Sequence, residues 1–156
     1  MSKKYFTMTP AVYLILQKDD RFLFLQRKNT GFQDGNYSLP AGHVDGNERL
    51  VDSMIREAKE EIGMDLFEED LKLVHVMHRN YQIDHPEDER LDFYFIAKKW
   101  NGEIENCEPH KCSDLSWFSL EDAPNNVIPY IRQAVQCAVH NIVLSDEDFD
   151  SKELIR

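Results

Sequence analysis

Two short apolar runs near the start of the chain predict a pair of adjacent strands. Residues 11–17 read AVYLILQ and residues 21–27 read RFLFLQR, and both runs are rich in the aliphatic and aromatic residues that favour strands. Three polar residues, 18–20, separate the two runs and have a composition typical of a turn. The pattern therefore predicts a β-hairpin over residues 11–27.

An apolar stripe at helical spacing follows this hairpin. Four apolar residues recur at every fourth position, namely Leu50, Met54, Ala58 and Ile62. Asn47 is a residue type suited to the N-cap, and Gly63 is suited to the C-terminal end of a helix. We therefore expect a helix that begins after Asn47 and runs to about Ile62.

The rest of the chain alternates between apolar runs and polar segments. Further strands are expected at residues 37–39, 71–79, 91–98 and 115–118, a second helix at 128–142, and loops at 29–36, 42–47 and 84–90. The acidic residues 145–150 are expected to be frayed or disordered. The order of strands, helix, strands and helix favours an α+β or mixed α/β fold over a regular βαβ repeat.

Length and composition indicate one soluble domain. The chain has 156 residues, of which 42% are hydrophobic and 30% charged, and no apolar run is long enough to span a bilayer. We expect a single domain over residues 1–156, with a core at about 5–143 and an acidic tail at 144–156. The first ten residues have no apolar secretion-signal core, and three cysteines are an odd number, so we expect a cytoplasmic protein.

The net charge narrows the class of partner. A value of −11 argues against a sequence-independent nucleic-acid binder, which needs a basic surface. It leaves room for an anionic small molecule, because bound cations reverse the local field. Cys107, His110 and Cys112 lie close together but lack a second ligand pair of the usual zinc spacing, so ordinary structural roles are preferred.

Three carboxylates on the predicted helix suggest a metal site. Glu57, Glu60 and Glu61 are separated by three and four positions, which places them on one narrow face beside the apolar stripe. Like charges at this spacing cost about 0.2–0.5 kcal/mol per pair on an exposed helix, and partial burial raises the cost. Mg²⁺ or Mn²⁺ suits such an oxygen set, while the alternative is a solvated acidic face.

The spacing of the surrounding residues matches a known motif. The Nudix box reads Gly, five residues, Glu, seven residues, Arg-Glu, an apolar residue, any residue, Glu-Glu, any residue, Gly and an apolar residue. Its fixed positions are filled by Gly42, Glu48, Arg56, Glu57, Glu60, Glu61 and Gly63, with a small Ala58 at the first apolar position and Met64 at the last. Residues 23–45 and 107–124 also resemble the segments that flank the box in this family. The chain thus resembles a Nudix hydrolase over most of residues 11–124, and the resemblance implies an α/β/α sandwich with a central mixed sheet.

The resemblance also implies roles for individual residues. It assigns Glu57, Glu60 and Glu61 as metal ligands, with the carbonyl oxygen of Gly42 completing the coordination. It further implies that Arg56 and Glu48 form an ion pair that orients these glutamates, which would contribute only about 0–1 kcal/mol as a surface pair.

Six more residues are candidates for the site. Glu108 falls where many family members place a further carboxylate, used as metal ligand or base, although a solvated turn residue is the alternative. Arg27 ends the second strand and is a candidate phosphate contact. The aromatic rings that can stack on a base are Phe32, Tyr37, Tyr81 and Trp117, with packing in the core as the preferred role of each.

The implied reaction is metal-dependent hydrolysis of a diphosphate linkage in a small nucleotide. Metals neutralise the diphosphate and lower the pKa of bound water, while Glu60, Glu61 or Glu108 accepts the proton. We expect a nucleoside triphosphate to give the monophosphate and pyrophosphate, and the protein to be a monomer or homodimer without nucleic-acid or membrane partners.

Several alternatives stay open at this point. Tyr81 lies seventeen residues after Met64, as in diadenosine polyphosphate hydrolases. Nucleotide sugars are another class, although ADP-sugar hydrolases often carry a proline near the position of Arg79 and this chain does not. A non-catalytic nucleotide-binding module and an isoprenoid diphosphate isomerase are further readings, and the intact glutamate set argues against the former.

Overall fold

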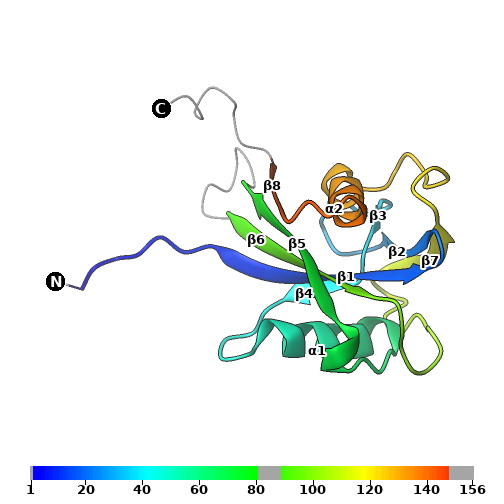
Figure 1. Ribbon diagram of the computed structural model, residues 1–156, viewed down its shortest axis with the longest axis horizontal. Coiled ribbons are helices and arrows are strands. Elements are labelled where there is room, and N and C mark those ends of the chain that lie inside the picture. The colour runs from blue at the N-terminus through cyan, green and yellow to red at the C-terminus, as the bar shows by residue number, and fades with distance from the viewer. Residues whose placement is uncertain (1, 81–88, 148–156) are drawn as a thin grey trace.

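A mixed β-sheet organises the molecule, and the computed structural model describes residues 2–80 and 89–147 (Figure 1). Its strands are β1 (Thr9–Lys18), β2 (Arg21–Arg27), β3 (Tyr37–Ser38), β4 (Ala41–His43), β5 (Lys72–Arg79), β6 (Arg90–Ala97), β7 (Cys112–Phe118) and β8 (Leu144–Glu147). The strand order is β3-β2-β1-β6-β5-β8, while β4 also pairs with β1 and β7 with β2. The pairs β1·β6 and β5·β8 are parallel and the others antiparallel, so the predicted mixed sheet is confirmed.

Helices α1 (Leu50–Ile62) and α2 (Pro129–Val139) cover opposite faces of the sheet (Figure 1). A short 3₁₀ helix, η1 (Glu68–Asp70), follows α1. Alternate residues of β1 divide between the two cores: Val12 and Leu14 pack with α1, while Tyr13 and Ile15 pack with α2. The α/β/α arrangement that the resemblance implied is therefore confirmed.

The hairpin at the start of the chain forms as predicted. Strands β1 and β2 pair antiparallel with Gln17 opposite Phe22, and Asp19 adopts a positive φ of 56° in the turn between them. The predicted end of α1 is also confirmed, because Gly63 takes the left-handed conformation with φ 70° and its N–H bonds to Lys59 O.

Two boundaries around α1 differ from expectation. The helix is capped by Arg49 and not by Asn47, whose φ of 62° is left-handed and unlike the extended backbone of an N-cap. The segment expected to be a loop from Gly42 begins instead as strand β4, because its backbone pairs with Ala11 and Val12 of β1. Pairing with a distant strand leaves no local signature in so short a segment.

The acidic tail also differs from expectation, because Leu144–Glu147 forms strand β8 beside β5. Its sequence, LSDE, has little intrinsic preference for a strand. Buried His75 of β5 holds the segment through two bonds, from Nδ1 to the Ile142 carbonyl oxygen at 2.7 Å and from Nε2 to the Ser145 hydroxyl at 2.8 Å. A tertiary contact thus overrides local propensity.

No helix among the described residues has the length and apolar character needed to cross a membrane.

A buried ion pair lies on the α2 side of the sheet. Arg79 Nε donates to Asp92 Oδ2 at 2.7 Å, and the two side chains are 1% and 0% exposed. The Arg79 guanidinium also lies 3.8 Å from the ring centre of Tyr130 on α2. Burial raises the pKa of Asp92, and the charge of Arg79 opposes this rise. The pair therefore ties β5, β6 and α2 together at the cost of removing two charges from water.

We predict that Asp92→Ala lowers the free energy of unfolding by about 3–5 kcal/mol, because it leaves the Arg79 charge buried without its carboxylate. The combined change Asp92→Leu and Arg79→Met should recover most of this loss, since neither charge then needs compensation. Urea unfolding followed by circular dichroism measures both. The matched control is Arg49→Ala, which breaks an exposed pair with Asp52 and should cost about 0–1 kcal/mol. An Asp92→Ala variant as stable as the wild type contradicts the prediction.

Candidate active site

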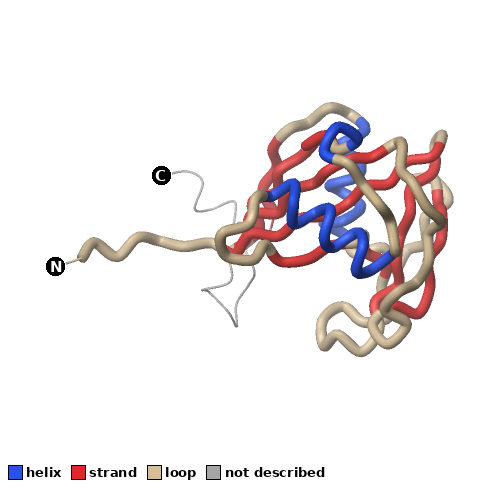
Figure 2. The backbone as a smooth tube through the Cα atoms, turned by 90° about the horizontal axis from the view of Figure 1, so that it is seen from below, coloured by secondary structure: helices blue, strands red, loops and turns tan. Residues whose placement is uncertain are grey.

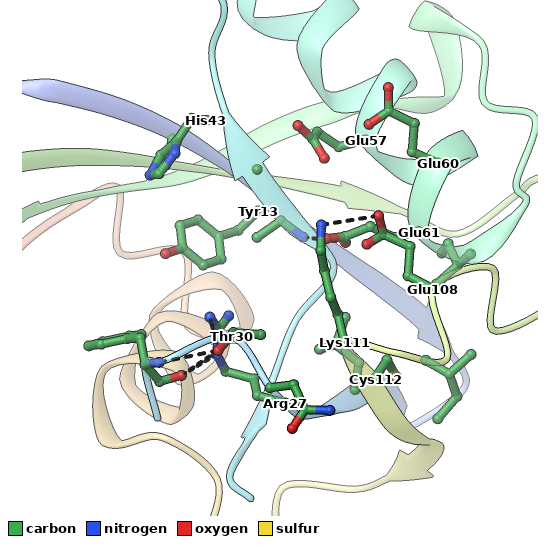
Figure 3. Close-up of a pocket in the computed structure, with 18 of the residues that line it drawn as sticks. Tyr13, Arg27, Thr30, His43, Glu57, Glu60, Glu61, Glu108, Lys111 and Cys112 are labelled. Atoms are coloured by element: carbon green, nitrogen blue, oxygen red, sulfur yellow. Dashed lines mark hydrogen bonds and ion pairs between the residues drawn. The ribbon is translucent and has the colours of Figure 1, made fainter. Parts of the chain in front are cut away.

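A cavity of about 620 Å³ opens between the C-terminal half of α1, strand β4 and the loop before β7 (Figure 3). It brings together six of the residues proposed from the sequence, which are Arg27, Gly42, Glu57, Glu60, Glu61 and Glu108. Further lining residues include Tyr13, Phe32, His43, Arg90, Lys111 and Tyr130. The cavity thus combines a carboxylate wall with basic and aromatic groups.

Glu61 is held at the centre of the carboxylate wall. Its Oε2 accepts the backbone N–H of Ala41 on β4 at 2.8 Å. Burial of the carboxyl raises its pKa to about 8, and the negative charges of Glu57 and Glu108 add to the rise. Burial likewise raises the pKa of Glu57, with Glu60 and Glu108 contributing. Both shifts arise first from burial, and the neighbouring carboxylates add to them.

Gly42 lies in direct contact with Glu57. A Cβ atom at position 42 would overlap the Glu57 carboxylate, so any residue other than glycine would force that carboxylate out of its position. The constraint is one of space alone, because positive φ is not among the backbone features of Gly42. This explains in physical terms why the motif begins with glycine.

Arg56 links the glutamates to the loop before the helix. Its Nε donates to Glu48 Oε1 at 2.8 Å, and its Nη1 donates to Glu57 Oε1 at 2.8 Å and more weakly to Glu60 Oε2 at 3.4 Å. The predicted pair of Arg56 and Glu48 is thus confirmed as a contact. Hydrogen bonds from Arg56 and from the Asp45 N–H lower the pKa of Glu48 to about 2.

Glu108 comes from the loop before β7, and its side chain lies beside Glu61 at the cavity (Figure 3). Its backbone N–H donates to Asn106 Oδ1 at 3.2 Å, and its carbonyl oxygen accepts the N–H groups of Lys111 and Cys112. These bonds close a turn that presents both Glu108 and Lys111 to the cavity, where their side chains lie 3.4 Å apart. The position that the resemblance proposed for Glu108 therefore falls at the site.

Arg27 also reaches the cavity, but its guanidinium is partly engaged. Its Nε donates to the carbonyl oxygen of Phe32 at 2.7 Å, and its Nη2 donates to the Thr30 hydroxyl at 3.0 Å. The same guanidinium lies 5.4 Å from the ring centre of Phe32. Arg27 thus organises the loop between β2 and β3 as well as lining the cavity.

The sequence interpretation missed several lining residues. His43 follows the motif glycine directly and lies 3.3 Å from Arg90 Nη1, and Lys111 follows Glu108 by three positions. Their closeness in sequence to Gly42 and Glu108 is the signal that could have identified His43 and Lys111. Arg90 and Tyr130 come from β6 and α2, and nothing local in the sequence links them to the motif.

One of the proposed substrate contacts, Tyr37, does not line the cavity. The Tyr37 hydroxyl donates to Asp114 Oδ2 at 2.6 Å, and its ring packs edge-on against Phe118 with centres 5.5 Å apart. The hydrogen bond with Asp114 raises the pKa of Tyr37 to about 12, and Tyr37 does not line the cavity. Tyr81 lies outside the described residues.

Trp117 likewise packs away from the cavity. It stacks on Trp100 with ring centres 6.0 Å apart, on the α1 side of the sheet. Among the four aromatic residues singled out as base-stacking candidates, Phe32 alone is placed by the described structure at the cavity.

The ligand types of the wall suit a hard divalent cation. Glu57, Glu60 and Glu61 offer only oxygen atoms, and the raised pKa of Glu61 reflects a cluster that a cation would relieve. Within the described ranges, no three His, Cys, Asp or Glu side chains converge as a preformed ligand set, and Arg56 bonds to two of the glutamates. Cys112 is buried and its thiol donates to the Asp114 carbonyl oxygen at 3.2 Å.

Comparison with known proteins gives the family. The family model of the NUDIX domain matches residues 7–136. The uncharacterized Nudix hydrolase YvcI of Bacillus subtilis is 31% identical over 71% of this chain and 66% of its own length. An ADP-ribose pyrophosphatase of Methanocaldococcus jannaschii is 40% identical over 40% of this chain and 38% of its own length.

Solved structures agree with this assignment. The crystal structure of a MutT NUDIX hydrolase from Burkholderia pseudomallei superimposes with a TM-score of 0.73 at 27% identity, covering 83% of this chain and 97% of that one. The chain spans less than two thirds of the lengths of the two curated relatives named above. The family model nevertheless covers more than half of the chain and includes the whole carboxylate wall, and the chain therefore belongs to the Nudix hydrolase family.

Proposed function

We propose that this cavity hydrolyses a diphosphate linkage in a nucleotide with the help of Mg²⁺ or Mn²⁺. The observation that carries the proposal is the convergence of four carboxylates on one cavity, those of Glu57, Glu60, Glu61 and Glu108, with Glu61 bonded to the Ala41 N–H. Oxygen ligands of this kind suit a hard divalent cation.

The residues that would hold the cation are Glu57, Glu60 and Glu61, with the Gly42 carbonyl oxygen and Glu108 as further ligands. When bound, such an ion neutralises phosphate oxygens and lowers the pKa of water. Glu60, Glu61 and Glu108 are the candidates for accepting the proton, because all three line the same cavity. Arg56 acts as a positioning residue, since it contacts Glu57 and Glu60 and is itself held by Glu48.

The basic and aromatic wall suits the rest of a nucleotide. Arg27, Arg90 and Lys111 bring positive charge to the cavity, which favours a phosphate chain. The rings of Tyr13, Phe32 and Tyr130 supply apolar surface for a base or ribose. We propose a nucleoside triphosphate as the substrate.

We also propose a cytoplasmic location, which the three free cysteines support because thiols stay reduced there.

A nucleotide diphosphate joined to a sugar is the second candidate substrate. The relative from Methanocaldococcus jannaschii is named an ADP-ribose pyrophosphatase and is 40% identical over 65 residues, which favours this class. A triphosphate and a nucleotide sugar share the central diphosphate, so the same carboxylate wall serves either. The preference for one substrate class over the other must therefore come from the basic and aromatic residues that line the rest of the cavity.

Replacing Gly42 tests the close contact between β4 and α1. Gly42→Ala should reduce turnover about 100-fold, because the new methyl group displaces the Glu57 carboxylate by an amount on the order of 1 Å. Gly46→Ala is the matched control, since a Cβ there meets nothing within 4 Å. Steady-state phosphate release with Mg²⁺, alongside melting temperatures, separates a site effect from unfolding. Equal activity of the two variants would show that the contact is unimportant.

Replacing Glu61 tests the cation proposal through both activity and stability. Glu61→Gln should reduce turnover by about 100-fold or more, since it removes a ligand and candidate proton acceptor. Glu69→Gln, on the exposed η1 helix, is the control and should leave turnover unchanged.

The pH dependence without metal gives an independent readout. The pKa of Glu61 rises from 4.5 to about 8 on folding, so the unfolded chain loses this proton first as the pH increases. Wild-type stability should therefore decline between about pH 4.5 and pH 8, and Glu61→Gln should show a smaller decline, which Glu57 and Asp92 still cause because their pKa values are also raised. Added Mg²⁺ should raise the wild-type melting temperature at pH 8 more than that of the variant. Identical melting profiles with and without metal, together with full activity in chelator, would refute the cation assignment.

A substrate screen with a product assay tests the reaction. We expect a nucleoside triphosphate to have a higher kcat/KM than ADP-ribose and to give the monophosphate and pyrophosphate. Running the reaction in ¹⁸O-labelled water identifies the attacked phosphorus from the product that carries the label. Labelled orthophosphate with a nucleoside diphosphate would mean cleavage at the β–γ linkage, and a far higher kcat/KM for ADP-ribose would favour the second candidate.

A further inference from the structure

An arm of seven residues, 2–8, leaves the body of the protein at the start of β1 and projects away from it in both views (Figures 1 and 2). Tyr5 and Phe6 are 71% and 68% exposed, and Met8 is 36% exposed. In the part of the chain that the structure describes, no hydrogen bond or ion pair joins the arm to the body. Its one described ring contact is internal, from Lys3 Nζ to the Tyr5 ring at 5.2 Å. Two aromatic side chains thus lie in solvent, and none of the described residues covers them.

Strand β8 offers a surface that matches this arm. It is the last strand in the sheet order, and no other strand among residues 2–80 and 89–147 pairs with its outer edge. Five apolar side chains surround the start of this edge and are 45% to 69% exposed: Leu73, Val139, Ile142, Val143 and Leu144. We call this set the β8 patch. A cluster of this kind beside an open strand edge is typical of an interaction site.

The charges of the two segments are opposite. The arm carries Lys3 and Lys4 and no acidic residue, whereas β8 carries Asp146 and Glu147. In the arm the two lysines are followed directly by Tyr5 and Phe6, and at β8 the apolar residues come just before the acidic ones. An extended pairing of the two segments can therefore form apolar contacts and ion pairs at the same time. Electrostatic complementarity of this type steers and selects partners.

We propose that the arm of one copy of this chain adds as an extended strand to the open edge of β8 in a second copy, and that two copies exchange arms in this way. Backbone hydrogen bonds to the strand edge provide the pairing, as in other cases of strand addition. Tyr5 and Phe6 cover the β8 patch, and the two lysines lie near Asp146 and Glu147.

The reach of the arm excludes pairing with its own β8. To pair with the outer edge of its own β8, the arm would have to cross the sheet past β6, β5 and β8, a distance of four strand spacings from β1. Four spacings of about 4.8 Å make about 19 Å, which uses about six extended residues at 3.3 Å each. Tyr5 and Phe6 lie only four and three residues before Thr9, which is too few to reach this distance. A second copy has no such limit, because its β8 edge can approach the arm directly.

The surface involved is large enough for a stable dimer. An aromatic side chain buries about 150–250 Å², so four rings from two arms and an equal area on the receiving copies give roughly 1,200–2,000 Å². That is the range of standard stable protein interfaces. The proposal does not depend on the hydrolase reaction, and its test needs no substrate.

Sedimentation equilibrium of the full-length protein tests the proposal directly. We expect the wild type to be a dimer, and Phe6→Asp and Val143→Asp to weaken dimerisation by about tenfold or more, because each places a charge in the apolar contact. Deletion of residues 2–8 should give a monomer. Phe67→Asp is the matched control, since Phe67 is 50% exposed but lies outside the arm and the β8 patch, and it should not change the dimer.

Two further results decide between this interface and others. Melting temperatures near that of the wild type show that each variant is folded, and the arm deletion leaves every strand and helix intact. A disulfide cross-link tests the contact, using a variant with Phe6→Cys and Val143→Cys and with Cys107→Ser to remove the exposed thiol. Oxidation of this variant should give a covalent dimer. A monomeric wild type, a dimer that survives arm deletion, or a cross-link confined within one chain would each overturn the proposal.

Discussion

The close approach of strand β4 to helix α1 is the constraint on which the site depends. Gly42 pairs with Val12 of the central strand, and the Glu57 carboxylate fills the space that a side chain at position 42 would need. One turn further along the helix, Glu61 accepts the N–H of Ala41 on the same strand. Two of the three carboxylates are therefore held against the backbone of the sheet, and their positions follow from the fold.

This arrangement gathers negative charge where water is scarce, and the protein offsets that charge only in part. Arg56 neutralises the outer side of the cluster through Glu48, Glu57 and Glu60, while Glu61 is left with a raised pKa. Complete neutralisation by protein groups would leave no electrostatic reason for a cation to bind. The incomplete balance is thus the feature that links the fold to the proposed chemistry.

The opposite wall of the cavity depends on a second set of buried charges. Arg79 and Asp92 pair inside the α2 side of the sheet, and Arg79 also contacts the ring of Tyr130, which lines the cavity. A buried pair of this kind is weak evidence for stability, because removing both charges from water is costly. Its geometric effect is clear, since it fixes α2 relative to β5 and β6 and so positions Tyr130.

The sequence by itself determined the parts of this protein that depend on neighbouring residues. The hairpin, the helix ending at Gly63 and the shared face of the glutamates follow from spacings of a few positions. The pairing of Arg56 with Glu48 follows from the resemblance to the family motif. Only the tertiary structure decided the features that join distant segments: the strand at Leu144–Glu147, the arrival of Arg90 and Tyr130 at the cavity, and the turning of Tyr37 towards Asp114. The physical reason is that periodicity and motif spacing are local properties of a chain, whereas strand pairing and side-chain packing are decided between segments that the sequence keeps far apart.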